Sequence, residues 1–338
     1  MPVLIKLLSQ WRVFDSPGKH KIHSEYIPSL GGICIALGAA FAQVIGLPFS
    51  EWATLKYFYI AIAMMFITGI RDDILTLTPR EKLIGQLLPV IIVVVFGDIG
   101  LSSFYGIAFE DVQFSVYVTW AITIFTVVIL TNAYNLIDGL DGLAGAVGLV
   151  SLLFFGVWFA LVGDVPYALI SLSFAGSVAA FLYYNWQPSK IFMGDTGALV
   201  IGLLLSFMTI RFINTNYALP ASPARFASSI GTAMMVMIIP IFDTLRVIII
   251  RLRNGESPFH ADRNHLHHQF LKLGFSHARS VTIIIGIHLF FVALAIALKN
   301  SPDAVILPVA IAGCLIISMA IKMAQKRHVR NGGKSLIT

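Results

Sequence analysis

The sequence has few charged residues and almost no cysteine. Only 12% of its 338 residues are charged, 57% are hydrophobic, and the mean hydropathy is +0.85. Soluble domains carry about 25% charged residues, so this composition excludes a water-soluble protein and indicates an integral membrane protein. The two cysteines, Cys34 and Cys314, both lie in apolar runs. Neither a disulfide framework nor a cysteine metal site is therefore indicated.

About ten apolar runs are long enough, or nearly so, to cross a hydrocarbon layer as helices. They begin near Ile33, Leu55, Leu83, Ser115, Leu143, Pro166, Ala198, Ala227, Val281 and Ala304. We therefore expect an all-α polytopic membrane bundle of about ten transmembrane helices. A single domain is expected over residues 1–325, with a basic tail over 326–338, and the chain is expected to be disordered after Lys322. Residues 1–14 are expected to form a short amphipathic helix at the membrane interface.

The basic residues are distributed unevenly between the loops. If the spans alternate across the membrane, both termini lie on one side, and that side holds most of the 23 Lys and Arg residues. The positive-inside rule makes this side cytoplasmic. No internal repeat is evident in the sequence, which weakens the alternative of an ion-coupled transporter built from inverted halves.

Four groups of polar residues fall in different loops or helix ends on the expected cytoplasmic side. They are Asp72-Asp73, the run from Asn135 to Asp141, Asp195, and the run from His260 to His268. A carboxylate next to a membrane span is costly unless a cation, a hydrogen-bond network or water stabilises it. The arrangement predicts one cytoplasmic site for a cation or for phosphate groups.

The run from Asn132 to Gly142 joins two expected spans. Asn135, Asp138 and Asp141 are three residues apart, so a helix that continued through them would place their polar groups on one face. Gly139 and Gly142 argue against an intact helix and indicate a backbone that lets a ligand come close. The alternative is an ordinary polar loop between two helices.

Asp72 and Asp73 follow a span directly. Adjacent helical residues point about 100° apart, so we expect the two carboxylates to have different roles. The alternative is a solvated charged cluster beside Arg71.

Asp195 lies between glycines at the start of a span, where phosphate oxygens can approach and a helix N-terminus attracts negative charge. Mg²⁺ is usually held by one or two carboxylates together with substrate phosphates. The alternative for Asp195 is an N-cap.

The last polar run is rich in histidine. His265 and His268 are three residues apart, and with Arg263 they could hold a diphosphate through directed hydrogen bonds and charge. Zinc binding and a solvated basic loop are the alternatives. Asp243 and Arg246, inside the eighth expected span, are interpreted as a structural pair.

These motifs, in this order, resemble those of the polyprenyl-phosphate N-acetylhexosamine-1-phosphate transferases, which start bacterial O-antigen, common-antigen and teichoic-acid synthesis. The matches run from about Asp15 to about His268. They are Asp15-x-Pro17 with Pro28 and Gly31-Gly32, Asp72-Asp73 with Lys82 and Gln86, Asn135-Leu-x-Asp138-Gly-x-Asp141-Gly, Asn185 ahead of Phe192-Met-Gly-Asp195-x-Gly197, and Ser257-Pro-Phe with Asp262-Arg263-Asn264-His265-Leu266-His267-His268. One departure is that only fourteen residues precede Asp15, where family members generally carry a full span.

The resemblance implies a role for each matching residue. Asp195 and Asn135 would hold Mg²⁺, or alternatively Mn²⁺. Asp72 would activate the lipid phosphate with support from Asp73, and Asp138 would help to orient the metal and that phosphate. The substrate-binding set would comprise Asp141, Asn185, Phe192, Arg263, His265, His267, His268, Lys21 and Lys82. Within this set, Phe192 would stack on uracil.

The resemblance also implies the reaction. N-acetylglucosamine-1-phosphate would pass from UDP-N-acetylglucosamine to undecaprenyl phosphate, and UMP would be released. The protein would lie in the bacterial inner membrane with its active site facing the cytoplasm, with a homodimer as an option and no nucleic-acid partner. The alternatives are another UDP-N-acetylhexosamine or the UDP-muramoyl-pentapeptide as donor. The related muramoyl-pentapeptide translocase resembles the last loop less well, which favours UDP-N-acetylglucosamine.

Overall fold

A computed structural model describes residues 1–11, 27–107, 112–257 and 264–330 of the chain. Within these ranges the secondary structure is helical, and an isolated bridge between Ser103 and Gln113 is the only β-type pairing. The helices are α1 (Pro2–Trp11), α2 (Gly31–Gly46), α3 (Phe49–Leu75), α4 (Pro79–Phe96), α5 (Val116–Leu136), α6 (Leu143–Val162), α7 (Val165–Asn185), α8 (Gly194–Ala218), α9 (Ile230–Val236), α10 (Ile238–Arg253), α11 (Leu266–Lys272), α12 (His277–Ala297) and α13 (Asp303–Arg330). The predicted all-α class is confirmed.

Among the described residues, seven helices are long and apolar enough to cross a membrane, and the chain is therefore a multi-pass membrane protein. They are α3, α5, α6, α7, α8, α12 and α13, and the bent pair of α9 and α10 would make an eighth span. The expectation of about ten is slightly too high. The helix α2 has only 16 residues, and α4 begins with the charged residues Arg80, Glu81 and Lys82.

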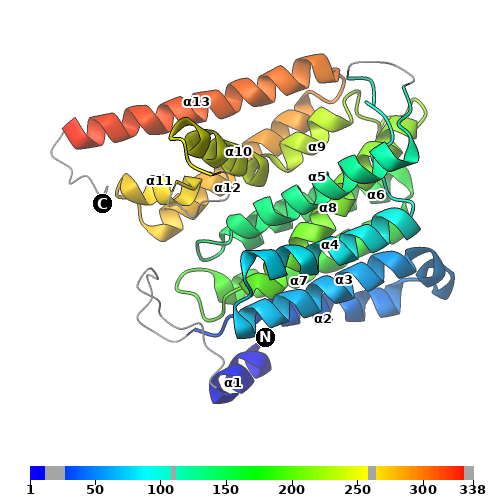
Figure 1. Cartoon of the computed structure of the whole chain (residues 1–338), viewed down its shortest axis with the longest axis horizontal. Helices are drawn as coiled ribbons and strands as arrows, with labels where there is room; N and C mark the ends of the chain where they lie inside the picture. Colours follow the sequence, from blue (N-terminus) through cyan, green and yellow to red (C-terminus); the bar gives the residue numbers. More distant parts are fainter. Residues whose placement is uncertain (12–26, 108–111, 258–263, 331–338) are drawn as a thin grey trace.

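The helix α8 forms the centre of the bundle. Its apolar stretch is 94% buried, whereas that of α13 is 17% buried. The helices α2, α3, α5 and α6 all pack against α8 (Figure 1). A helix that is apolar on every side can pack against other helices all around it, and α8 does so.

The chain leaves helical geometry between α5 and α6, as the glycines predict. The helix α5 ends at Leu136, and α6 begins at Leu143 after Gly142, whose φ is +82°. Glycine adopts this left-handed conformation without the steric cost of a side chain. The polar residues of the run therefore lie in and beside a turn rather than along one continuous helical face.

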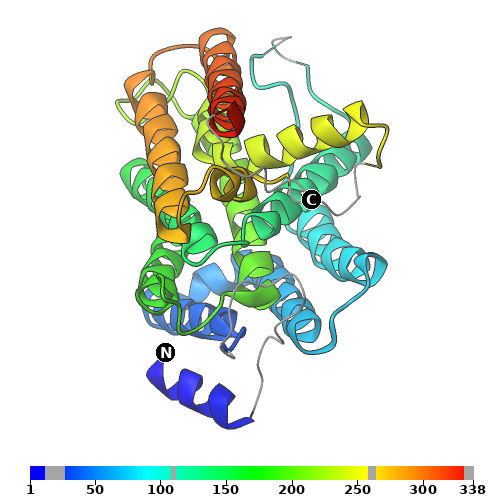
Figure 2. The ribbon, with the colours of Figure 1, turned by 90° about the vertical axis from the view of Figure 1, so that its left-hand side faces the viewer.

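The helix α11 and the C-terminal end of α13 lie at one end of the bundle (Figure 1). Figure 2 looks along the bundle from that end and shows α10 lengthwise, because α10 is bent by 85° from α9. The helix α1 spans Pro2–Trp11, so helical structure near the start of the chain is confirmed. The expectation of disorder after Lys322 is wrong as far as Arg330, because α13 continues to that residue.

Candidate active site

The end of α3 meets the start of α8 through Asp73. Its carboxylate accepts hydrogen bonds from the backbone N–H groups of Asp195 at 2.7 Å and Thr196 at 3.0 Å, and from the Thr196 hydroxyl at 2.5 Å. The first N–H groups of a helix lack partners within the helix and favour a negative charge. A side chain at Gly194 would collide with the Ser29 carbonyl and with this carboxylate. Asp73 therefore fixes the backbone that carries Asp195.

Asp72 points in a different direction from Asp73, as their adjacent helical positions predict. One oxygen of its carboxylate accepts a hydrogen bond from the Leu77 N–H at 2.8 Å, and the other lies 2.9 Å from the Lys82 ammonium. Thr76, with a φ of +47°, ends α3 between them. Asp72 thus stabilises the turn between α3 and α4 and pairs with Lys82 in the first turn of α4.

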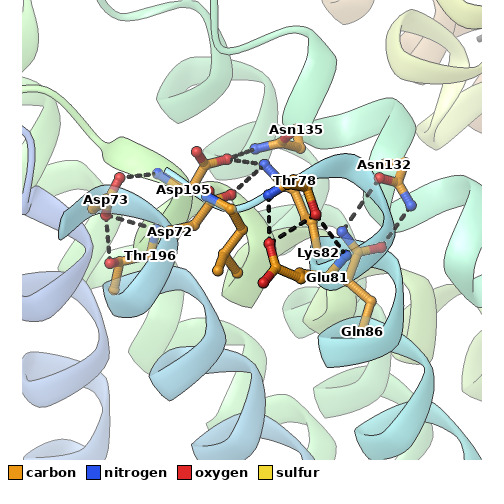
Figure 3. Close-up of polar contacts among 11 residues, drawn as sticks. Asp72, Asp73, Thr78, Glu81, Lys82, Gln86, Asn132, Asn135, Asp195 and Thr196 are labelled. Carbon is orange, nitrogen blue, oxygen red and sulfur yellow. Dashed lines mark hydrogen bonds and ion pairs between the residues drawn. The ribbon is translucent and has the colours of Figure 1, made fainter. Parts of the chain in front are cut away.

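Asp195 lies beside two nitrogen donors. The Lys82 ammonium and the Asn135 amide both bond to the same carboxylate oxygen, the amide at 2.7 Å (Figure 3). The Asp195 side chain is 31% exposed, so its carboxylate is open to a ligand. The ends of α3 and α5 and the starts of α4 and α8 therefore bring Asp72, Lys82, Asn135 and Asp195 into one cluster.

A pair of amides lies beside this cluster, between α4 and α5, at the right of Figure 3. The Asn132 amide donates to the Gln86 side-chain oxygen at 2.6 Å, and the Gln86 amide donates back at 3.3 Å. Gln86 is one turn from Lys82, and Asn132 is three residues before Asn135. The reciprocal pair therefore sets the register that lets both donors reach Asp195.

Asp138 lies in the turn between α5 and α6. Burial, reinforced by the negative charges of Asp195, Asp73 and Asp141, raises the pKa of its carboxyl group to about 8. A carboxyl group in this environment takes up either a proton or a cation. The excess of acids around Lys82 therefore creates an electrostatic demand for further positive charge.

Residues 264–268, the described part of the histidine-rich run, are held by α10, and we call them the histidine loop. The Asp243 carboxylate, 1% exposed, lies 2.9 Å from His265 Nδ1 and accepts a hydrogen bond from the Leu266 N–H at 2.7 Å. The Arg246 guanidinium lies 3.5 Å from the same carboxylate and donates to the Asn264 carbonyl. The pairing of Asp243 with Arg246 agrees with the interpretation from sequence, but the partnership with His265 was not foreseen.

The histidine loop also contacts residues 137–142 between α5 and α6, which we call the acidic turn. A Cβ atom on Gly139 would lie 2.5 Å from His267 Nε2, so this imidazole approaches because the turn has a glycine there. The rings of His265 and His267 are stacked at 5.9 Å, and those of His267 and His268 lie 4.2 Å apart. Burial, aided by the nearby His268, lowers the pKa of His267 to about 3. His267 is therefore a neutral hydrogen-bonding group at pH 7.

Asn185 and Phe192 organise the loop between α7 and α8. The Asn185 side chain accepts a hydrogen bond from the Gly142 N–H at 2.8 Å and donates to the Ile191 carbonyl at 2.9 Å. The Phe192 backbone bonds to Pro28 and Gly31, and its side chain is half-buried. Asn185 thus ties the acidic turn to the segment that carries Phe192.

The structure brings most of the expected site residues to one end of the bundle. Asp141 lies in the same turn as Asp138 and is 8% exposed. His268 follows His267 and is half-buried. Lys21 and Arg263 lie outside the described residues. The expected nearness of these two residues to the site therefore stays a prediction.

The donor set can be compared with the needs of Mg²⁺. Among the described residues, no group of three or more His, Cys, Asp or Glu side chains is arranged as metal ligands. Mg²⁺ needs only one or two carboxylates when substrate phosphates and water supply the other oxygens. The exposed Asp195 carboxylate, the Asn135 amide oxygen and the electrostatic demand around Asp138 fit that mode of binding.

Three partners of the site were missed in the sequence. They are Asn132 as the partner of Gln86, the Thr196 hydroxyl as the partner of Asp73, and Asp243 as the partner of His265. Asp243 carried a usable signal, because an ionisable residue inside an apolar span is commonly functional. The other two depend on how neighbouring helices are aligned.

Comparison with known proteins agrees with this geometry. Residues 55–213 match the family described as "Glycosyl transferase family 4". A Bacillus subtilis protein, named as a probable undecaprenyl-phosphate N-acetylglucosaminyl 1-phosphate transferase, is 31% identical over 89% of this chain and 81% of its own. A decaprenyl-phosphate N-acetylglucosaminephosphotransferase of Mycolicibacterium smegmatis is also 31% identical, over 90% and 80%.

An undecaprenyl-phosphate alpha-N-acetylglucosaminyl 1-phosphate transferase of Escherichia coli O157:H7 is 27% identical to this chain, over 95% of it and 87% of the relative. The similarity thus extends well beyond residues 55–213 and includes the ends of the helices that form the site. The chain is therefore a multi-pass membrane phosphotransferase that belongs to glycosyl transferase family 4, the polyprenyl-phosphate N-acetylhexosamine-1-phosphate transferases.

Proposed function

We propose that the protein transfers N-acetylglucosamine-1-phosphate from UDP-N-acetylglucosamine to undecaprenyl phosphate and releases UMP. The observation that carries the proposal is the cluster of Asp72, Lys82, Asn135 and Asp195 at one end of the bundle. Relatives whose names specify this lipid and this sugar support the choice of substrates. The step would open the synthesis of a cell-surface polysaccharide.

The chemistry requires positioning and neutralisation of charge more than a protein nucleophile. A lipid phosphate oxygen would attack the β-phosphorus of the donor, the bond from that phosphorus to the UMP oxygen would break, and UMP would leave. The acceptor phosphate is largely ionised near pH 7. Asp72 would therefore take only its residual proton or hold it in place, and no covalent aspartyl intermediate is needed.

Asp195 and Asn135 would hold Mg²⁺, with Asp138 beside them. The ion would neutralise negative charge on the donor diphosphate when bound. Lys82 already lies between the carboxylates of Asp72 and Asp195, so its ammonium is placed where a phosphate oxygen would enter the cluster. Mn²⁺ would serve in the same coordination.

The histidine loop and the α7–α8 loop would bind the donor. His267 would donate or accept hydrogen bonds as a neutral imidazole, and His265 would be oriented by Asp243. Phe192 would stack on uracil, and Asp141 would contribute to the nucleoside pocket. Asn185 would act by shaping that pocket, because its amide is engaged by the backbone at Gly142 and Ile191.

The location of the site follows from the two substrates. One substrate has a long hydrocarbon tail and the other is water-soluble, so the reaction would occur at a membrane surface. We place that surface on the cytoplasmic side of the bacterial inner membrane, because the loops around the site hold most of the basic residues.

An ion-coupled transporter is the alternative from a different class. Transporter sites commonly lie near the bilayer midplane at broken helices. The acids of the cluster, Asp72, Asp73 and Asp195, lie at helix ends on one side of the bundle, which favours the transferase.

A donor panel tests the proposal. Purified protein would be given undecaprenyl phosphate, Mg²⁺ and one of UDP-N-acetylglucosamine, UDP-N-acetylgalactosamine or UDP-muramoyl-pentapeptide. Mass spectrometry would identify the lipid product, and UMP release would give the rate. We expect the pyrophosphate-linked N-acetylglucosamine lipid to form fastest. Preference for another donor would reject the sugar assignment, and absence of UMP with every donor would reject the reaction.

A further inference from the structure

The break between α9 and α10 leaves the Val236 carbonyl without a helical donor. The helix α9 ends at Val236, and α10 begins at Ile238 with a bend of 85°. In an unbroken helix, the N–H of residue 240 would bond to the Val236 carbonyl, but residue 240 is a proline and has no N–H group. Val236 is 0% exposed, so a donor must come from elsewhere in the protein.

Ser151 of α6 supplies that donor. Its hydroxyl donates to the Val236 carbonyl at 3.0 Å, and its oxygen lies 3.2 Å from His288 Nε2 of α12. The hydroxyl has one proton, which is used on Val236, so the contact with His288 is satisfied when Nε2 carries a hydrogen and donates to Ser151. Both side chains are 0% exposed. We call this chain from His288 through Ser151 to the Val236 carbonyl the Ser151–His288 latch.

The latch lies close in sequence to the residue that holds the histidine loop. Asp243 follows Pro240 by three residues on α10, and its carboxylate bonds to His265 and to the Leu266 N–H. Arg246, one turn further along, donates to the Asn264 carbonyl. The direction in which α10 leaves the break therefore determines where the histidine loop lies relative to the acidic turn.

We propose that Ser151 and His288 are positioning residues, which fix the break between α9 and α10 and thereby hold the histidine loop in its donor-binding position. Neither residue contacts the acid cluster directly. A purely structural role would require only that these buried polar groups satisfy each other. A positioning role requires, in addition, that their loss acts on donor binding while the acceptor side is spared.

The kinetic test rests on the proposed function and uses Ser151→Ala. We expect the KM for UDP-N-acetylglucosamine to rise about tenfold, because loss of one buried hydrogen bond shifts an equilibrium by about that factor. The KM for undecaprenyl phosphate should stay within about twofold, since α3, α4 and α8 are untouched. Ser151→Thr keeps a hydroxyl at this position and should restore donor KM.

The matched control is Ser171→Ala. Ser171 is also a 0% exposed serine of a membrane helix, but its hydroxyl donates to the Met208 thioether at 3.2 Å and serves no unpaired carbonyl. We expect this control to leave both KM values unchanged. Equal changes in Ser151→Ala and Ser171→Ala, or equal rises in both KM values of Ser151→Ala, would overturn the positioning role.

A second measurement does not depend on the enzymatic reaction. Hydrogen–deuterium exchange would compare wild type with Ser151→Ala in detergent without substrates. We expect faster exchange in residues 241–254 and 264–272 and unchanged exchange at the start of α8. Unchanged exchange in those two segments would overturn the latch. Absence of transfer by the wild-type protein would reject the proposed function while this measurement still decides the latch.

Discussion

The two ends of α8 differ in how far their charged side chains balance one another. At its first turn, Asp195 lies with Asp72, Asp73 and Asp138, and Lys82 is the cation that bridges two of them. This end has an excess of carboxylates. Among the described residues this excess is not balanced, and negative charge at a membrane boundary is costly, so we expect it to attract a cation.

At the far end of α8 the charges are matched one to one. The Arg211 guanidinium bonds to the Asp164 carboxylate at 2.8 Å and lies over the Tyr167 ring at 4.6 Å. This pair needs no further ligand. The comparison teaches that the bundle balances charge where its only task is to join helices, and leaves an excess where a cation and phosphates would bind.

Among the substitutions at the two ends of α8, replacing Asp195 should reduce activity the most. Asp195→Asn keeps the shape of the side chain but removes the charge that would hold the metal. We expect the rate of UMP release to fall about a thousandfold, because metal stabilisation of a phosphoryl transition state is worth several kcal/mol. The variant should remain folded in detergent, since this side chain is 31% exposed. A rate within twofold of wild type would refute its role.

Replacing His267 should affect the donor side alone. His267→Ala removes an imidazole that packs against Gly139, and we expect the KM for the UDP-sugar to rise about tenfold through a lost hydrogen bond to phosphate. The KM for the lipid should not change. His328→Ala, at the end of α13, is the control and should leave both KM values as they are. Equal rises in both values would count against this assignment.

The raised pKa of Asp138 predicts a dependence on pH. The pKa of its carboxyl group is about 8 in the folded protein, whereas an aspartate outside the fold has a pKa of 3.8. The folded state therefore binds the proton more tightly. The contribution of Asp138 to the stability of the metal-free protein should therefore fall as pH rises from about 4 to about 8. Mg²⁺ should raise Tm more at pH 8 than at pH 6, because it binds the deprotonated group. Asp138→Asn should remove this difference, and an equal Mg²⁺ effect at both pH values would contradict the account.

The matched pair at the far end should give the smallest effect. Arg211→Gln removes the charge from a side chain that is 41% exposed. We expect a loss of stability of about 1 kcal/mol or less and unchanged kinetics. Thermal unfolding and UMP release would be measured together. A large loss of activity with normal stability would show that the far end also takes part in the reaction.

Helix positions were predictable from the sequence because the membrane imposes a length. The apolar runs begin within six residues of the observed helices, the largest difference being between Leu55 and Phe49. The interruption at Gly139 and Gly142 was also predictable, since glycine favours a break. The number of spans was overestimated, because the short α2 and the charged start of α4 have nearly the same apolar character as true spans.

The contacts that build the site were less predictable. Asp243 and His265 are separated by the rest of α10 and by the loop after it, and they meet because the chain returns to α10, which hydropathy does not detect. Pro240 predicts a break but not its angle. The Gln86–Asn132 pair depends on the alignment of two helices, and local sequence does not determine that alignment. The residues of the cluster could therefore be named from their motifs, and their roles stay predictions, whereas their hydrogen-bond partners required the fold.

The most direct test of the central claim is a binding titration with a spectroscopic metal. Mn²⁺ would be titrated into the purified protein with UDP-N-acetylglucosamine present, and bound metal would be measured by electron paramagnetic resonance. The account predicts one bound Mn²⁺ that Mg²⁺ displaces, that Arg211→Gln retains and that Asp195→Asn loses. Binding of equal strength to the Asp195→Asn variant would contradict it.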